Sequence, residues 1–282
     1  MYSIDSIIQR VDEFPTLPTI YMALSDVMAN PRSTVNDAAA IISRDQSAAV
    51  KILKVANSSV YGIKGKITTI SQAIFFIGFD EVKNLVVALS VMKLFASSKS
   101  TESLNPIDLW KHSIAVGVIT RIIGKALGIK HIENYFVAGI LHDIGKLFFY
   151  KYFNEDYSKV IALALEKKIS IREAEFQKFG ITHTTIGEML AEKWKLPKVL
   201  RGVIGSHFSG TGDDKNDPIT ACVHLANIIS HIIDMGSVAD LQIQQPNPAI
   251  WELLNLPDNF FTKSYKVFFR DYEESANILT TN

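Results

Sequence analysis

The sequence lacks the features that would place it in several large classes of protein. Cys222 is the single cysteine among 282 residues, so no internal disulfide can form and a reducing compartment is expected. Basic and acidic residues number 29 each, which gives no positive excess for a dedicated nucleic-acid-binding protein. The longest mostly apolar run, residues 85–92, is too short to cross a bilayer, and the first residues lack a signal-peptide pattern. We therefore expect a cytoplasmic protein with no membrane span and no dedicated nucleic-acid binding.

The sequence also lacks alternating strand patterns, a repeat of fixed period and a glycine-rich phosphate loop. Apolar residues instead recur at helical spacing along most of the chain. The pattern predicts an all-α protein. Helices are expected over residues 3–11, 19–29, 70–77, 80–95, 157–166 and 171–179, between 46 and 57, after Thr34, from Pro106, near Ile132, from Thr182, after Pro197, from Pro218, and once or twice in the tail after residue 244.

The stretch Gly-Ile-Leu-His-Asp-Ile-Gly-Lys at residues 139–146 places His142 directly before Asp143 in an apolar run. The spacing of its apolar residues predicts one mostly buried helix that carries both side chains. A buried carboxylate is costly unless it is paired or bound to a cation. The pair is therefore either a structural pair satisfied by hydrogen bonds or part of a metal site with nitrogen and oxygen ligands.

Four of the seven histidines lie on, or at the edge of, the apolar side of a predicted helix: His112, His142, His183 and His207. A single histidine of this kind is usually a core residue that donates to a carbonyl group. Four of them on four helices favour a common site with a carboxylate, suited to iron, manganese or zinc. His131 is expected in a loop. His224 and His231 are expected on the polar side of the helix from Pro218, with His231 solvated.

Lys146 follows Asp143 by three residues, so the two are expected on the same side of the helix. Two interpretations are open for Lys146. Its ammonium could meet an anionic ligand such as a phosphate at the metal, or its stem could cover apolar neighbours at the surface. If the site were catalytic, Asp143 and Lys146 would be the candidate catalytic residues.

These residues resemble the HD superfamily of metal-dependent phosphohydrolases. His112 matches its first histidine, and His142-Asp143 matches its namesake pair. His183 and His207 match the two later histidines of the branch that hydrolyses cyclic di-GMP. In the first half, segments 14–18, 41–46, 52–62 and 71–78 look like the HDOD domain, the HD-related output domain of bacterial signalling proteins.

The resemblance spans about residues 12–235 and implies an HD-domain-like helical bundle with an N-terminal helical subdomain. It implies metal ligation by His112, His142, Asp143, His183 and His207. The expected cofactor is a divalent transition metal, iron first and manganese or zinc as alternatives, as one or two ions. Residues 97–105 are polar and predict a linker, so we expect an N-terminal helical part at 1–104, a metal-site part at 105–235 and a helical tail at 236–282.

Two departures from the HD pattern bear on catalysis. Asn227 stands where the superfamily places a late aspartate ligand, and a neutral amide is a poorer ligand than a carboxylate. The His-Glu and Gly-Tyr-Pro elements of the phosphodiesterases are missing after His207. HDOD domains are generally thought to have lost hydrolysis and to act through protein contacts. Lys146 and Asn227 would then face a bound ligand, such as a nucleotide or phosphate.

Three hypotheses follow. The leading one is a bacterial regulatory module that keeps a metal in a residual HD site and acts by binding a signalling protein or a phosphorylated ligand. The second is a metal-dependent phosphodiesterase or phosphohydrolase, in which a metal activates water and Lys146 steadies phosphate charge. The third is a metal-free interaction scaffold, in which the histidines are ordinary core residues. The departures above favour a non-enzymatic function.

Overall fold

The computed structural model describes residues 3–17, 19–59, 61–96, 105–129, 132–212, 218–236 and 243–280. Within these ranges the chain is helical and contains no strand, which confirms the predicted all-α fold. His131 and residues 97–104 of the expected linker lie outside the described residues.

The observed helices agree closely with those expected from the apolar spacing. They are α1 (Ile4–Glu13), α2 (Thr19–Ala29), α3 (Val35–Ile42), α4 (Gln46–Ala56), α5 (Ile70–Ile77), α6 (Phe79–Ala96), α7 (Pro106–Ala126), α8 (Glu133–Leu141), α9 (Ile144–Tyr152), α10 (Asn154–Lys167), α11 (Ile171–Phe179), α12 (His183–Lys193), α13 (Lys198–Ser206), α14 (Ile219–Ile232), α15 (Ala249–Leu254) and α16 (Phe260–Thr280).

Capping side chains explain several of these boundaries. Thr34 accepts a hydrogen bond from the backbone N–H of Asp37, whose carboxylate accepts one from the N–H of Thr34, so α3 begins with a complete capping box. Asp45 caps α4 through the N–H of Ala48. Gly78, with a φ of 90°, makes the sharp turn between α5 and α6 that a side chain would disfavour.

The prediction of one continuous helix through His142 and Asp143 is wrong. The chain breaks there: α8 ends at Leu141 and α9 begins at Ile144, with Asp143 at φ −103° and ψ 19°. The apolar spacing continues on both sides of the break, so periodicity does not reveal it. His142 Nδ1 donates to the carbonyl of Gly139 at 2.7 Å, so this side chain takes part in hydrogen bonding at the end of α8.

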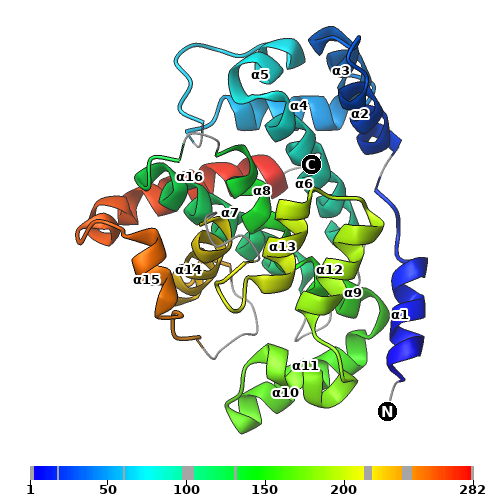
Figure 1. The fold of residues 1–282 in the computed structure, drawn as a ribbon, viewed down its shortest axis with the longest axis vertical. Helices are drawn as coiled ribbons and strands as arrows, with labels where there is room; N and C mark the ends of the chain where they lie inside the picture. The colour runs from blue at the N-terminus through cyan, green and yellow to red at the C-terminus, as the bar shows by residue number, and fades with distance from the viewer. Residues whose placement is uncertain are drawn as a thin grey trace.

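Helix α7 forms the centre of the molecule and packs against α8, α14 and α16. Helices α2 to α5 gather at one end of the molecule, and α10 and α11 lie at the opposite end (Figure 1). Helix α6 packs on α4, α7 and α8 and so connects the N-terminal helices with this central layer. The histidine-bearing elements all belong to the part around α7.

Helix α1 packs against α12, far along the chain. The Lys193 ammonium donates hydrogen bonds to the carbonyl groups of Val11, Asp12 and Phe14, at 2.9, 2.5 and 2.6 Å. Trp194 Nε1 donates to the carbonyl of Pro15 at 3.0 Å. The first residues therefore rest on the expected metal-site part, and the division into 1–104, 105–235 and 236–282 stays a prediction.

Two glycines allow α7 and α8 to approach closely. A Cβ added to Gly139 would lie 2.5 Å from the Cα of Gly117, so backbone would have to move.

We expect Gly139→Ala to lower the free energy of unfolding by about 2 to 3 kcal/mol, measured by urea denaturation. Gly202→Ala is the control: it lies in helix α13 with nothing within 4 Å of an added Cβ. It should be neutral or slightly stabilising, and equal losses in both variants would contradict the close-packing explanation.

Candidate metal centre

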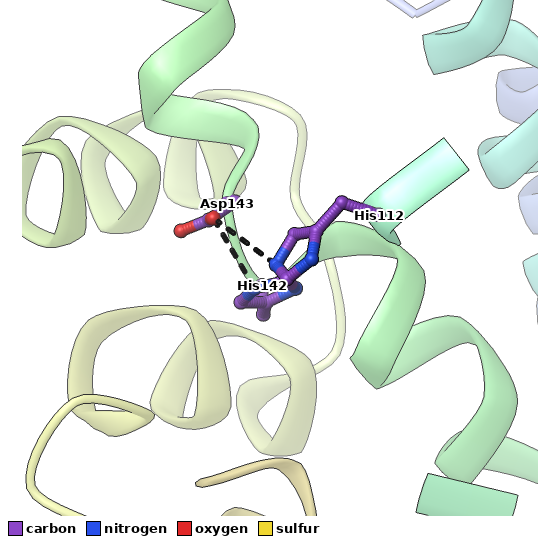
Figure 2. Close-up of side chains that lie close together, drawn as sticks. All are labelled: His112, His142 and Asp143. Atoms are coloured by element: carbon purple, nitrogen blue, oxygen red, sulfur yellow. Dashed lines mark ion pairs between the residues drawn. The ribbon is translucent and has the colours of Figure 1, made fainter. Parts of the chain in front are cut away.

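Four helix ends or faces bring the predicted ligands together. His112 projects from α7, His142 and Asp143 occupy the break between α8 and α9, His183 begins α12, and His207 follows α13. All five side chains are at most 3 % exposed. Figure 2 shows His112 and His142 converging on the Asp143 carboxylate. The structure thus gathers all five predicted ligands into one buried cluster.

Asp143 lies between two pairs of histidines. Its Oδ2 atom is 3.3 Å from His142 Nε2 and 4.0 Å from His112 Nε2. Its Oδ1 atom is 3.4 Å from His183 Nε2 and 3.5 Å from His207 Nε2. Each carboxylate oxygen therefore forms, with two imidazoles, one group of three atoms close enough to share a cation.

The Nδ1 atoms of the histidines are held by acceptors outside the cluster. His142 Nδ1 donates to the carbonyl of Gly139 at 2.7 Å, and His207 Nδ1 donates to that of Ile204 at 3.0 Å. Because a carbonyl only accepts, Nδ1 carries the proton in both rings. The lone pair of each Nε2 is then directed at the cluster, as a metal ligand requires.

His183 is held by a buried carboxylate. Glu175 Oε2 accepts from His183 Nδ1 at 2.7 Å and from the His183 backbone N–H at 2.8 Å. Tyr157 donates to the other oxygen of Glu175 at 2.5 Å. The carboxylate thus orients the ring and also satisfies a first-turn N–H of α12, where Thr182 makes no side-chain cap.

His112 is held by a hydroxyl group. Ser230 Oγ donates to the carbonyl of Asn227 at 2.7 Å, so its oxygen can accept from His112 Nδ1, 3.3 Å away. All four rings consequently present Nε2, rather than Nδ1, toward Asp143. A set of ordinary core histidines has no reason to share this orientation.

His224 provides the contrast. It is buried, not on a polar helix side as the sequence suggested. Its Nδ1 donates to the carbonyl of His207 at 2.9 Å, and its Nε2 accepts from the N–H of Asn247 at 3.2 Å. Both nitrogens are satisfied by backbone, so His224 is a structural histidine that supports His207.

Asp143 Oδ2 faces the Lys146 ammonium at 2.8 Å, and four further polar atoms of the cluster make no hydrogen bond within the described part of the chain: His112 Nε2, His142 Nε2, Asp143 Oδ1 and Asn227 Oδ1. Leaving such atoms unmet in the interior is costly. Two ligand atoms about 2.1 Å from one transition-metal ion lie about 3.0 to 3.4 Å apart at ordinary angles. The distances from Asp143 to His142 and His183, 3.3 and 3.4 Å, fall in this range, and the 3.5 Å distance to His207 lies just above it, so these residues fit a metal ion.

The electrostatics of the cluster keep the Asp143 carboxylate charged and the His112 imidazole neutral. Burial alone would raise the pKa of Asp143, but His142 and Lys146 hold that pKa well below its usual range. Burial, with His231 and His142 adding to it, lowers the pKa of His112 well below its usual value. An ionised carboxylate among neutral imidazoles is the protonation state that binds metal.

Lys146 and Asn227 both reach this site. Lys146 is 5 % exposed and its Nζ lies 2.8 Å from Asp143 Oδ2, so it is not the surface lysine of the second interpretation. Both residues line a cavity of about 20 Å³ together with Asp143, His183, His207 and His231. A single water needs about 10 to 15 Å³, so the cavity holds one or two groups of that size.

His231 corrects another expectation. It is half-buried rather than solvated, and its ring lies 4.7 Å from that of His112, centroid to centroid.

Sequence reasoning also missed Glu175 and Ser230. A signal for Glu175 existed: it shares an apolar stripe with Ile171, Ala174 and Phe179, where an unpaired carboxylate would be unfavourable.

Comparison with known proteins agrees with the fold. The family model of the HDOD domain matches residues 14–209, and the chain therefore belongs to the HDOD domain family. An uncharacterised protein of Treponema pallidum is 25% identical over 231 residues, which are 81% of this chain but only 44% of that protein. The chain thus spans less than half of the length of this relative.

Solved structures share the fold over nearly the whole chain. An HDOD domain protein of unknown function from Geobacter sulfurreducens superposes with a TM-score of 0.75 at 23% identity, covering 98% of both chains. A proposed phosphohydrolase from Shewanella amazonensis gives a TM-score of 0.72 at 24% identity, covering 97% of this chain and 98% of the other. Separately, among the described residues, no helix has the length and apolarity needed to span a bilayer.

Glu175 offers a test of the cluster through a residue outside the ligand set. Glu175→Gln keeps the size of the side chain but weakens the hold on His183 Nδ1. We expect metal affinity, measured by competition with a chromophoric chelator, to fall about 10- to 100-fold. Glu173→Gln, an exposed site on the same helix, is the matched control. If both variants bound metal like the wild type, Glu175 would not support the centre.

His207 gives a prediction for pH. Burial, opposed in part by Asp143, lowers the pKa of His207 to about 4, against 6.5 for an ordinary histidine. At pH values between these two pKa values, His207 binds a proton more readily in the unfolded chain than in the folded protein, so acid favours unfolding. We expect the metal-free protein to lose on the order of 3 kcal/mol of stability as pH falls through this window. Urea denaturation with chelator present measures it, and His207→Gln should flatten the pH dependence; an unchanged slope would exclude His207 as its source.

Proposed function

We propose that this chain is a regulatory HDOD module that binds a divalent transition metal and does not turn over a phosphodiester. The observation that carries the proposal is the shared orientation of four buried imidazoles, each presenting Nε2 to one carboxylate. His112, His142, Asp143, His183 and His207 would hold the ion. When bound, such an ion would supply a fixed positive charge and Lewis acidity.

The protein's own residues favour holding over turnover. The cavity of about 20 Å³ leaves no room for a nucleotide beside the cluster. Lys146, which would steady phosphate charge in a hydrolase, is engaged with Asp143. Asn227 contributes an amide where a carboxylate would strengthen the site. A tightly enclosed ion would make the structure around α7, α12 and α13 dependent on metal. A signalling protein partner could then recognise the metal-bound form of this region.

A metal-dependent phosphohydrolase is the second candidate. The arrangement that favours it is Asp143 itself, whose two oxygens each face a separate pair of histidines. Asp143 would contribute a ligand to each group, and two ions held there would supply the Lewis acidity that two-metal hydrolases use. In this reading the cavity would have to open to admit a phosphate ester, because it holds only one or two groups the size of a water molecule.

Metal content and hydrolysis separate the two candidates. We expect protein purified without added metal to contain close to one transition-metal ion per chain, by elemental analysis. It should hydrolyse bis(p-nitrophenyl) phosphate and cyclic dinucleotides no faster than His142→Ala, the control for contaminating activity. Well under one metal per chain would refute metal binding. Hydrolysis that is lost in His142→Ala would instead establish the phosphohydrolase.

A further inference from the structure

The two halves of the cluster differ, although each consists of one Asp143 oxygen and two imidazoles. At Oδ1, His183 and His207 are nearly equidistant, at 3.4 and 3.5 Å. At Oδ2, His142 is close at 3.3 Å, but His112 is 4.0 Å away. The Oδ1 half therefore has the more regular spacing for a single ion.

A cation of the protein itself already lies at the Oδ2 half. Lys146 Nζ is 2.8 Å from Oδ2 and its side chain is buried. An ammonium group in this position neutralises the carboxylate oxygen that a metal would need. It would also repel a divalent ion placed beside it, in an interior where charge interactions are poorly screened.

The groups behind the ligands add to the difference. His183, in the Oδ1 half, donates Nδ1 to the Glu175 carboxylate, which makes its Nε2 a stronger donor to a cation. His112, in the Oδ2 half, has only the neutral hydroxyl of Ser230 at its Nδ1. The negative charge of Glu175 thus favours a cation at Oδ1 over a cation at Oδ2.

We propose that the centre takes one divalent transition-metal ion, at Asp143 Oδ1, His183 and His207, and that the Lys146 ammonium stands in for a second ion at Oδ2. This inference rests on the metal binding proposed above and adds its stoichiometry and position. The charges agree with it. Asp143 and Glu175 carry two negative charges and Lys146 one positive charge, so one divalent ion leaves an excess of one positive charge and two ions would leave three.

The stoichiometry tests the role of Lys146. Chelator-treated protein is titrated with Mn²⁺, and bound metal is counted after desalting while electron paramagnetic resonance separates isolated from spin-coupled ions. We expect one uncoupled ion in the wild type. Lys146→Met, which keeps the length but removes the charge, should bind a second ion with a coupled spectrum. Lys151→Met, an exposed position on the same helix, is the matched control and should still bind one.

The ligand variants test the position of the ion. His183→Gln should lose at least about tenfold more affinity for Mn²⁺ than His112→Gln, because His183 faces Oδ1 and His112 faces Oδ2. Circular dichroism melts identify any variant that does not fold, and Lys146→Gln replaces Lys146→Met if needed. Two ions in the wild type, one ion in both Lys146 variants, or greater loss in His112→Gln than in His183→Gln would overturn the inference. No ion in the wild type would refute the proposed metal binding itself.

Discussion

The Asp143 carboxylate is kept ionised in a part of the protein from which water is almost excluded, and the surrounding structure is arranged around that charge. An isolated carboxylate there would be strongly unfavourable and would take up a proton. Lys146 opposes the charge directly at Oδ2. The four imidazoles approach with their nitrogen lone pairs, which do not compensate a negative charge by themselves. Glu175 places a second buried carboxylate behind His183, so the buried carboxylates outnumber the ammonium group, and this is the physical basis for considering a metal.

The fold holds this charge by means of close backbone approaches. The break between α8 and α9 turns the chain so that Asp143 faces inward from a non-helical position. Gly145 then passes directly beside the start of α12, where an added Cβ would lie 1.9 Å from the carbonyl oxygen of His183. The distance between Asp143 and His183 is thus set by backbone contact rather than by flexible side chains. A cluster built in this way holds its side chains in one geometry and adapts poorly to another.

The sequence was sufficient to predict the all-α fold, most helix boundaries and the five clustered side chains, because apolar periodicity and capping residues act locally. The break at His142 could not be predicted in this way, since apolar residues keep helical spacing across it. His224 and His231 were assigned to a polar helix side, but neighbouring segments distant in sequence cover that side. Glu175 and Ser230 matter only through partners in other helices, and a periodicity argument does not identify such partners.

His224 bears on where the smallest functional unit of this protein ends. The family match stops at residue 209, yet His224 connects the carbonyl of His207 with the N–H of Asn247. Gln244 also donates to the carbonyl of Phe208, at 2.8 Å. The polypeptide after the matched region therefore packs against the cluster and helps to position His207. Sequence changes in that tail would be transmitted to His207, so relatives that share the family signature but differ after it need not share the geometry of this cluster.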